Sequence, residues 1–210
     1  MKDLYIIGAG GFGREVAWLV ERINEKEATW DLKGFIDDNA GRWDSTEDGY
    51  PVLGGCDYLM SLGEVYAVCA IGSSKLRRAV VKKLAESAVR FASVIDPSVI
   101  LSNRVSIGEG TIICAGSIVT VDIAIGRHNI INLDCTIGHD VVLNDFDTLY
   151  PSVNVSGNVV VGTCCELGTG AQIIQGKRIA DDTIIGAGTV VVRDIDEGGT
   201  YVGNPARKLK

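Results

Sequence analysis

The sequence lacks several features that would place the protein in particular classes. None of its six cysteines forms a CxxC pair, so neither a zinc ribbon nor a redox motif is indicated. No stretch reaches the roughly 18 uninterrupted apolar residues that a membrane span needs. The apolar run at the amino terminus is short and ends in glycines, which predicts a buried strand rather than a signal peptide. We therefore expect a cytoplasmic protein with reduced thiols.

The sequence has no excess of positive charge, and histidine is scarce. The net charge is −7, which argues against a nucleic-acid surface because such a surface needs a basic face. The only histidines are His128 and His139. A zinc hydro-lyase site would need three, so no metal site is expected.

The amino-terminal third has the pattern of a nucleotide-binding fold. An apolar run at 3–8 is followed by helical spacing at 12–26, and further strands are predicted at 32–36 and 65–71, with a helix at 75–87. The first turn carries a GxGxxG motif, in which glycine lets the backbone approach a phosphate, and Asp37 follows at about the distance of a ribose-binding acid. The alternative is that these glycines only close a tight turn. The segment is short for NAD, so a single nucleotide or a nucleotide sugar fits better.

The rest of the chain has a six-residue period. Each sixth position from Ile95 to Val191 is Ile, Val or Leu, 17 positions in all, and glycine often follows directly. This period predicts a parallel β-helix, with three repeats per coil and the aliphatic side chains stacked inside. An ordinary β-sandwich is the alternative, but the unbroken phase argues against it.

Several motifs together give the chain a resemblance to a known family. They are IIGAGGFGREV at the start, GFIDD at 34–38, YPVLGG at 50–55, AIGSS at 70–74, NLDCTIGHD at 132–140, SGNVVVG at 156–162 and YVGNPARKL near the end. With these motifs the chain resembles the hexapeptide-repeat acyltransferases, and more narrowly the bacterial sugar acetyltransferases of the PglD/NeuD type. The resemblance covers nearly the whole chain.

The resemblance implies an architecture and a set of partners. It implies an α/β Rossmann-like domain at 1–93 that binds a nucleotide sugar, then an all-β left-handed parallel β-helix at 94–210 with a C-terminal tail. It also implies a homotrimer, with acetyl-CoA as acyl donor lying in the groove between neighbouring subunits. The nucleotide sugar is expected to contact Gly8, Gly10, Gly11, Gly13, Asp37, Asp38, Gly72 and Ser73. Acetyl-CoA is expected to contact Thr148, Gly157, Gly203, Asn204, Pro205 and Ala206.

His139 is the candidate general base. It lies two residues after Ile137 and is therefore expected at an outward corner rather than in the core. Histidine titrates near neutrality, which suits removal of a proton from an attacking amine or hydroxyl. By resemblance His139 matches the family's base and Asp140 its acidic neighbour, and Gly157 is a candidate donor to the oxyanion. The alternative for His139 is a solvated corner. His128 is expected on the surface or in a groove, and Thr148 stands where the family often has a second histidine.

The predicted function is acetyl-CoA-dependent N-acetylation of a nucleotide-linked amino sugar in bacterial glycan biosynthesis. The alternatives are O-acetylation of sialic acid or another surface sugar, and a non-catalytic nucleotide-sugar-binding protein. An NAD-linked oxidoreductase is disfavoured, because the repeat domain would have no role in it.

Overall fold

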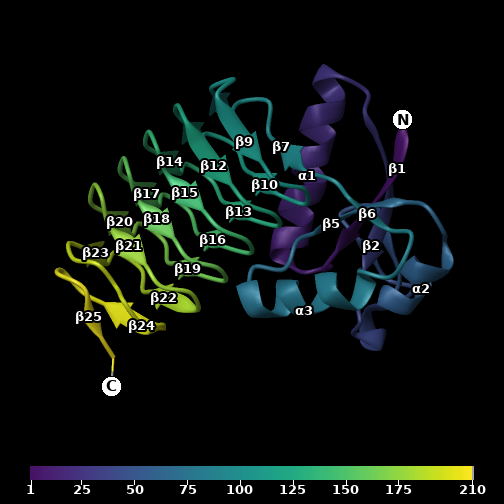
Figure 1. Ribbon diagram of the computed structural model, residues 1–210. Coiled ribbons are helices and arrows are strands. Elements are labelled where there is room, and N and C mark those ends of the chain that lie inside the picture. The colour runs from purple at the N-terminus through teal and green to yellow at the C-terminus, as the bar shows by residue number, and fades with distance from the viewer. Residues whose placement is uncertain (210) are drawn as a thin grey trace. The chain divides into compact units, whose positions relative to one another are not determined.

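The computed structural model describes residues 1–209 and divides the chain into two compact units, Met1–Pro97 and Ser98–Lys210. Figure 1 labels their helices and strands. Within the described residues, no helix is long and apolar enough to cross a membrane.

A mainly parallel sheet forms the centre of the first unit, as the sequence predicted. Across the sheet its strands are β3 (Thr46–Glu47), β4 (Tyr50–Gly54), β2 (Trp30–Ile36), β1 (Lys2–Ile7), β5 (Tyr66–Cys69) and β6 (Arg90–Phe91). Only β3 runs antiparallel to its neighbour. The remaining elements are α1 (Gly11–Lys26), η1 (Ala40–Arg42), α2 (Cys56–Ser61), α3 (Ser74–Leu84) and β7 (Val94–Ile95).

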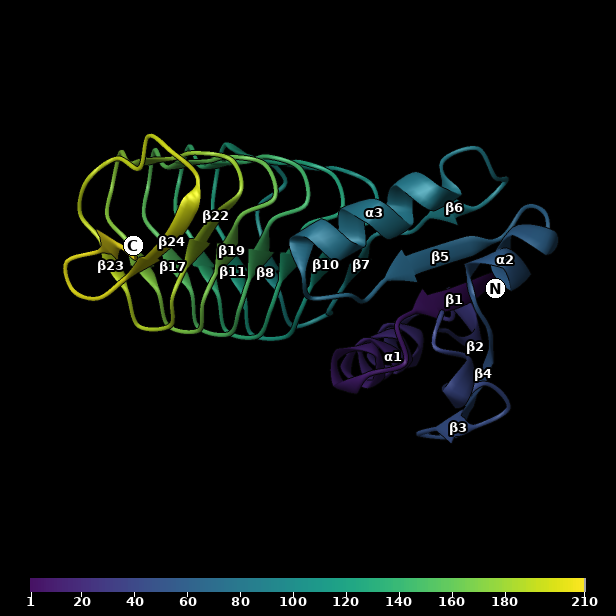
Figure 2. The same cartoon turned by 90° about the horizontal axis from the view of Figure 1, so that it is seen from below.

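Both faces of this sheet are covered. Tyr5 and Ile7 of β1 pack in a core with Leu59 of α2 and Leu84 of α3. Successive residues of a strand point to opposite faces of the sheet. Leu4 and Ile6 of β1 therefore face the side opposite Tyr5 and Ile7, where Figure 2 shows α1. Burial on two faces explains why β1 reads as a continuous apolar run.

The second unit is a parallel β-helix whose coils stack one on the next (Figure 1). One sheet contains β10 (Ile112–Ile113), β13 (Ile130–Ile131), β16 (Thr148–Leu149), β19 (Glu166–Leu167), β22 (Thr183–Ile185), β24 (Gly199–Val202) and β25 (Arg207–Lys208). Another contains β8 (Ile100–Leu101), β11 (Ile118–Val119), β14 (Thr136–Ile137), β17 (Asn154–Val155), β20 (Gln172–Ile173) and β23 (Val190–Val191). The third contains β9 (Val105–Ile107), β12 (Ile123–Ile125), β15 (Val142–Leu143), β18 (Val160–Val161) and β21 (Arg178–Ile179).

The predicted aliphatic columns form the interior of these coils. Strands pair with a register of 18 residues, as in Val119 with Ile137 and Ile137 with Val155. From Ile113 to Val191 every sixth residue is at most 4% exposed, and each such burial contributes roughly 1.5–3 kcal/mol. The prediction was wrong for Leu101, which is 38% exposed. Its strand β8 pairs with β11 on one side only, so no further coil of its own sheet covers it.

The corners of the coils have their own six-residue period. From Gly110 to Gly188 every sixth residue has a positive φ between 55° and 77°. Glycine, aspartate and asparagine fill most of these positions, because they enter the left-handed region at least cost. Asp140, with φ of 59°, is one of them. The corner therefore fixes the backbone beside His139.

Candidate active site

His139 lies at the corner that follows strand β14. Ile137 points inward and is 1% exposed, whereas the side chain of His139 is 52% exposed. The carbonyl of His139 accepts a hydrogen bond from the N–H of Asn158 in the next coil, at 2.8 Å. The expectation of an outward corner is thus confirmed, and the backbone of this histidine is held in place.

Asp140 orients the imidazole. Nδ1 of His139 lies 2.8 Å from Oδ2 of Asp140. A carboxylate accepts hydrogen bonds only, so Nδ1 carries a proton, and in the neutral imidazole the lone pair is therefore on Nε2. That tautomer is the one in which Nε2 can accept a proton from a substrate.

Gly157 lies beside the same ring, one coil further along. A Cβ placed on it would stand 2.5 Å from both Cε1 and Nε2 of His139, closer than atoms can approach. The carbonyl of Gly157 accepts a bond from Gly176 N–H at 2.9 Å, but its own N–H donates to no acceptor in the described part of the chain. Glycine therefore makes room for the imidazole and leaves an N–H donor in its vicinity.

Thr148 does not share this corner. It belongs to β16 in another sheet of the β-helix, and it is 1% exposed. The assignment of Thr148 to the acetyl-CoA site therefore stays a prediction.

The predicted position of His128 was wrong. Its side chain is 3% exposed rather than on the surface or in a groove. It stacks on Phe146 with ring centroids 5.0 Å apart and planes 13° from parallel. Beneath it a Cβ on Gly110 would come within 2.2 Å of the ring, so the imidazole fills the space between one coil's glycine and the next coil's phenylalanine.

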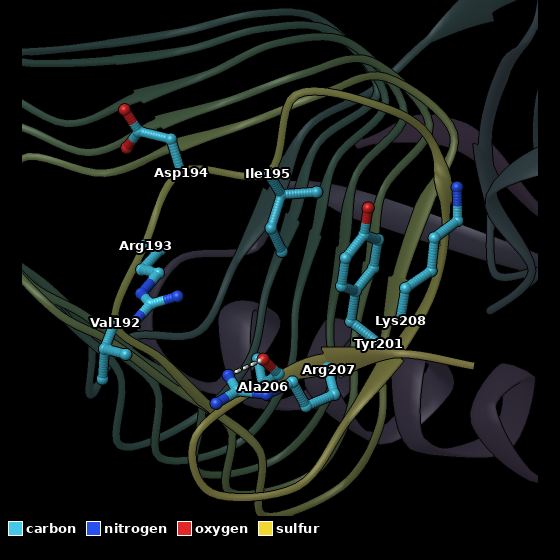
Figure 3. A pocket seen from close by; sticks show the side chains of 8 residues that line it. All are labelled: Val192, Arg193, Asp194, Ile195, Tyr201, Ala206, Arg207 and Lys208. Atoms are coloured by element: carbon cyan, nitrogen blue, oxygen red, sulfur yellow. Dashed lines mark hydrogen bonds between the residues drawn. The ribbon is translucent and has the colours of Figure 1, made fainter. Parts of the chain in front are cut away.

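The segment Gly203–Ala206 lies at the last coil, between β24 and β25. Figure 3 shows the hollow beside it, of about 320 Å³, with Arg193, Tyr201, Arg207 and Lys208 among its lining residues. Lys208 pairs with Glu197 at 2.8 Å, which raises the pKa of the lysine and lowers that of the glutamate.

Strand β14 is three strands from β23 in its sheet, so His139 lies about 14 Å from this end of the β-helix at the usual strand spacing. Neither Arg193 nor Tyr201 was predicted from the sequence as a site residue: Arg193 lies in no motif, and Tyr201 opens the YVGNPARKL motif, of which only Gly203–Ala206 was assigned to acetyl-CoA.

The first unit brings part of the predicted nucleotide site together. A hollow of about 240 Å³ at the carboxyl ends of β1, β2 and β5 is lined by Gly8, Asp37, Asp38 and the apolar side chains of Ile71 and Leu76, among others. Ligands bind at such strand ends in open α/β sheets. The other predicted residues of this site do not line that hollow: Gly10, Gly11, Gly13, Gly72 and Ser73.

The glycines and acids of this crevice have definite structural partners. A Cβ on Gly13 would come within 1.9 Å of the Gly8 carbonyl, so the start of α1 packs directly on the end of β1. Asp37 accepts hydrogen bonds from the N–H groups of Ala9 and Asn39 at 3.1 and 2.9 Å. Asp38 accepts one from the N–H of Cys56 at 2.7 Å, which lowers the pKa of its carboxyl. Gly72 is held by Arg77, which donates to its carbonyl at 3.1 Å.

Comparison with known proteins identifies the family. The domain family described as PglD N-terminal domain matches residues 3–84. GDP-perosamine N-acetyltransferase of Escherichia coli O157:H7 is 30% identical over 99% of this chain and 97% of its own length. The chain belongs to the PglD-type hexapeptide-repeat sugar N-acetyltransferases.

Solved structures of this family share the fold over the whole chain. A mutant of perosamine N-acetyltransferase from Caulobacter crescentus, in complex with CoA and GDP-perosamine, is 31% identical with a TM-score of 0.91, covering 100% of this chain and 98% of that one. The acetyltransferase domain of PglB from Neisseria gonorrhoeae, in complex with acetyl coenzyme A, is 30% identical with a TM-score of 0.89, covering 99% of each chain. The predicted fold class of an α/β domain followed by a β-helix is therefore confirmed, and so is the prediction of a sugar N-acetyltransferase.

Among the described residues, no group of three or more histidine, cysteine or acidic side chains is placed to hold a metal ion. None of the six cysteines forms a disulfide, and all six are buried. Burial raises the pKa of Cys56 and Cys135 to about 11 and that of Cys69 to about 12, so these thiols are not nucleophiles at neutral pH.

Proposed function

We propose that the protein transfers the acetyl group of acetyl-CoA to the amino group of a nucleotide-linked amino sugar, with His139 as the general base. The observation that carries this proposal is the corner at His139, where Asp140 holds the Nδ1 proton and leaves Nε2 free. Two relatives that match over nearly their whole length, from Escherichia coli O157:H7 and Caulobacter crescentus, act on or bind GDP-perosamine, which supports the substrate class.

The chemistry follows from the atoms at this corner. The sugar amine attacks the thioester carbonyl, and Nε2 of His139 takes the proton that the new C–N bond releases. The carboxylate of Asp140 stabilises the imidazolium. The N–H of Gly157 donates to the oxyanion of the tetrahedral intermediate. When the intermediate collapses, the C–S bond breaks and the proton on Nε2 passes to the CoA sulfur.

The two ends of acetyl-CoA are assigned to different coils. The thioester lies at His139, and the nucleotide end lies beside Gly203–Ala206, where Arg193 and Arg207 supply positive charge near the hollow of Figure 3. A spacing of about 14 Å between these places suits an extended CoA arm. A neighbouring copy in a homotrimer forms the other wall of the groove, in the cytoplasm where acetyl-CoA is made. The first domain, residues 1–93, holds the nucleotide sugar.

A CoA-thiol release assay tests the function. GDP- and UDP-linked amino sugars, free sialic acid and other hydroxyl acceptors are each offered with acetyl-CoA. We expect thiol release only with nucleotide-linked amino sugars, and its loss in His139→Ala with unchanged native mass. Release with sialic acid alone would favour O-acetylation, and binding of nucleotide sugar without any release would favour a non-catalytic binding protein.

A further inference from the structure

A second hollow in the first unit adjoins the crevice at the carboxyl ends of β1, β2 and β5. It measures about 420 Å³ and lies beside the ends of β2 and β4, with Trp43, Tyr58, Asp57 and Lys83 in its lining. Asp38 lines this hollow and also the crevice that Gly8 and Asp37 line. The two spaces therefore share a side chain, and one extended ligand can occupy both. The space of about 420 Å³ is called the Trp43 hollow below.

Trp43 is a rigid aromatic surface that faces solvent. Its side chain is large and 46% exposed, which is unusual for tryptophan. The ring is nevertheless fixed, because the indole N–H donates to the carbonyl of Asp37 at 2.8 Å. Tyr58, at 38% exposed, is a second aromatic ring in the same lining. Exposed, pre-positioned aromatic rings are the surfaces on which nucleobases stack.

The backbone of the Trp43 hollow at Gly54 and Gly55 carries no side chains. A Cβ on Gly55 would lie 2.6 Å from Oδ1 of Asp38, and one on Gly54 would lie 2.9 Å from Cβ of Tyr58. The two glycines thus let the chain pass close to both residues that a base would contact.

The charged groups of the hollow form one donor flanked by acceptors. Nζ of Lys83 lies 3.1 Å from Oδ1 of Asp57 and 3.6 Å from Oδ2 of Asp38, and these partners raise the pKa of the lysine. An ammonium next to carboxylate oxygens complements a base edge that has one carbonyl followed by N–H groups.

Guanine has that edge, with O6 followed by N1–H and N2–H. Uracil matches at O4 and N3–H, but its O2 would face the second carboxylate oxygen, and two acceptors in contact repel each other. Guanine also covers more of an aromatic ring than uracil does. We propose that the Trp43 hollow binds the base of the nucleotide sugar and selects guanine over uracil. This inference rests on the proposed function and names the nucleotide of its substrate.

Calorimetric titration of the full chain with GDP, UDP and ADP tests the assignment. GDP is expected to bind at least tenfold more tightly than UDP. Trp43→Ala is expected to weaken GDP binding about tenfold or more, the range for loss of one stacking partner. Trp18→Ala is the matched control, because Trp18 is also 50% exposed but does not line the hollow, and it should bind GDP as the wild type does.

Asp57→Asn tests whether the carboxylate of Asp57 accepts a hydrogen bond from the guanine edge. The side chain of Asp57 is 85% exposed, so the fold should tolerate the change. Asparagine offers an N–H where the carboxylate offered an acceptor, so GDP affinity should fall while UDP affinity holds or rises.

Three results would each overturn the proposal: equal affinity of the wild type for GDP and UDP, no detectable GDP binding, or GDP binding by Trp43→Ala that is as tight as that of the wild type. Thiol release with a UDP-linked amino sugar but not a GDP-linked one would overturn the guanine assignment and leave the acetyltransferase intact. Selective GDP binding without thiol release from any amino sugar would overturn the acetyltransferase activity and leave the guanine assignment intact.

Discussion

The corner at His139 predicts that a single methyl group at Gly157 removes most of the activity. Its Cβ would stand 2.5 Å from Cε1 and Nε2 of the imidazole, whereas ordinary contact begins at 3.4 Å. The ring must therefore shift by about 1 Å or rotate toward solvent, which its 52% exposure allows. Displacements of about 1 Å commonly cost about 100-fold in rate. We expect kcat of Gly157→Ala to fall about 100-fold.

A matched glycine separates displacement from loss of stability. Gly188 has φ of +66°, and no atom lies within 4 Å of its Cβ position. Gly188→Ala therefore strains the backbone but causes no steric clash. That variant should lose about 1–2 kcal/mol of stability and keep wild-type kcat. Gly157→Ala should show the opposite pattern, with a nearly unchanged Tm and low kcat. Steady-state thiol release and thermal unfolding measure both quantities. If Gly157→Ala turned over at the wild-type rate while His139→Ala was inactive, the placement of the base against Gly157 would be wrong.

Three further predictions concern other parts of the molecule. Asp140→Asn should lower kcat by at least tenfold with little effect on KM, because it removes the charge that holds the Nδ1 proton; a pH–rate profile that stays unchanged would count against this. Arg193→Ala and Arg207→Ala should raise KM for acetyl-CoA but leave the rate with a short acetyl-pantetheine thioester unchanged, since that donor lacks the nucleotide end. Stability should fall as pH rises from about 9 to 11: burial raises the pKa of Cys135 from 9.0 to about 11, so the unfolded chain loses a proton that the native state keeps. Denaturant unfolding under reducing conditions measures the slope, which Cys135→Ala should reduce.

The sequence predicted the elements whose physical cause is local or periodic. The β-helix followed from one aliphatic residue every six, because each coil must bury the same positions. The first strand, turn and helix followed from apolar spacing and glycine, and Gly13 shows why: only glycine fits against the Gly8 carbonyl. Contacts between distant segments were not predictable in this way. Trp43 reaches the carbonyl of Asp37 from a loop with no periodicity, and Arg193 and Tyr201 line one hollow only because the chain returns through β24 and β25 after the last coil.

The two histidines show what decides function within a regular repeat. Both stand at corners, but they differ by one residue in phase: His128, with φ of 56°, takes the left-handed position that Asp140 holds in the other corner, and His139 stands one residue before that position. Their vertical neighbours, 18 residues on, differ in size: Phe146 stacks on His128, whereas Gly157 lies against His139. The phenylalanine buries one imidazole as a core residue, and the glycine leaves the other exposed beside Asp140 with room for a substrate. The position of a histidine within the corner and the residue that the next coil places beside it together decide whether it packs in the interior or becomes a candidate base.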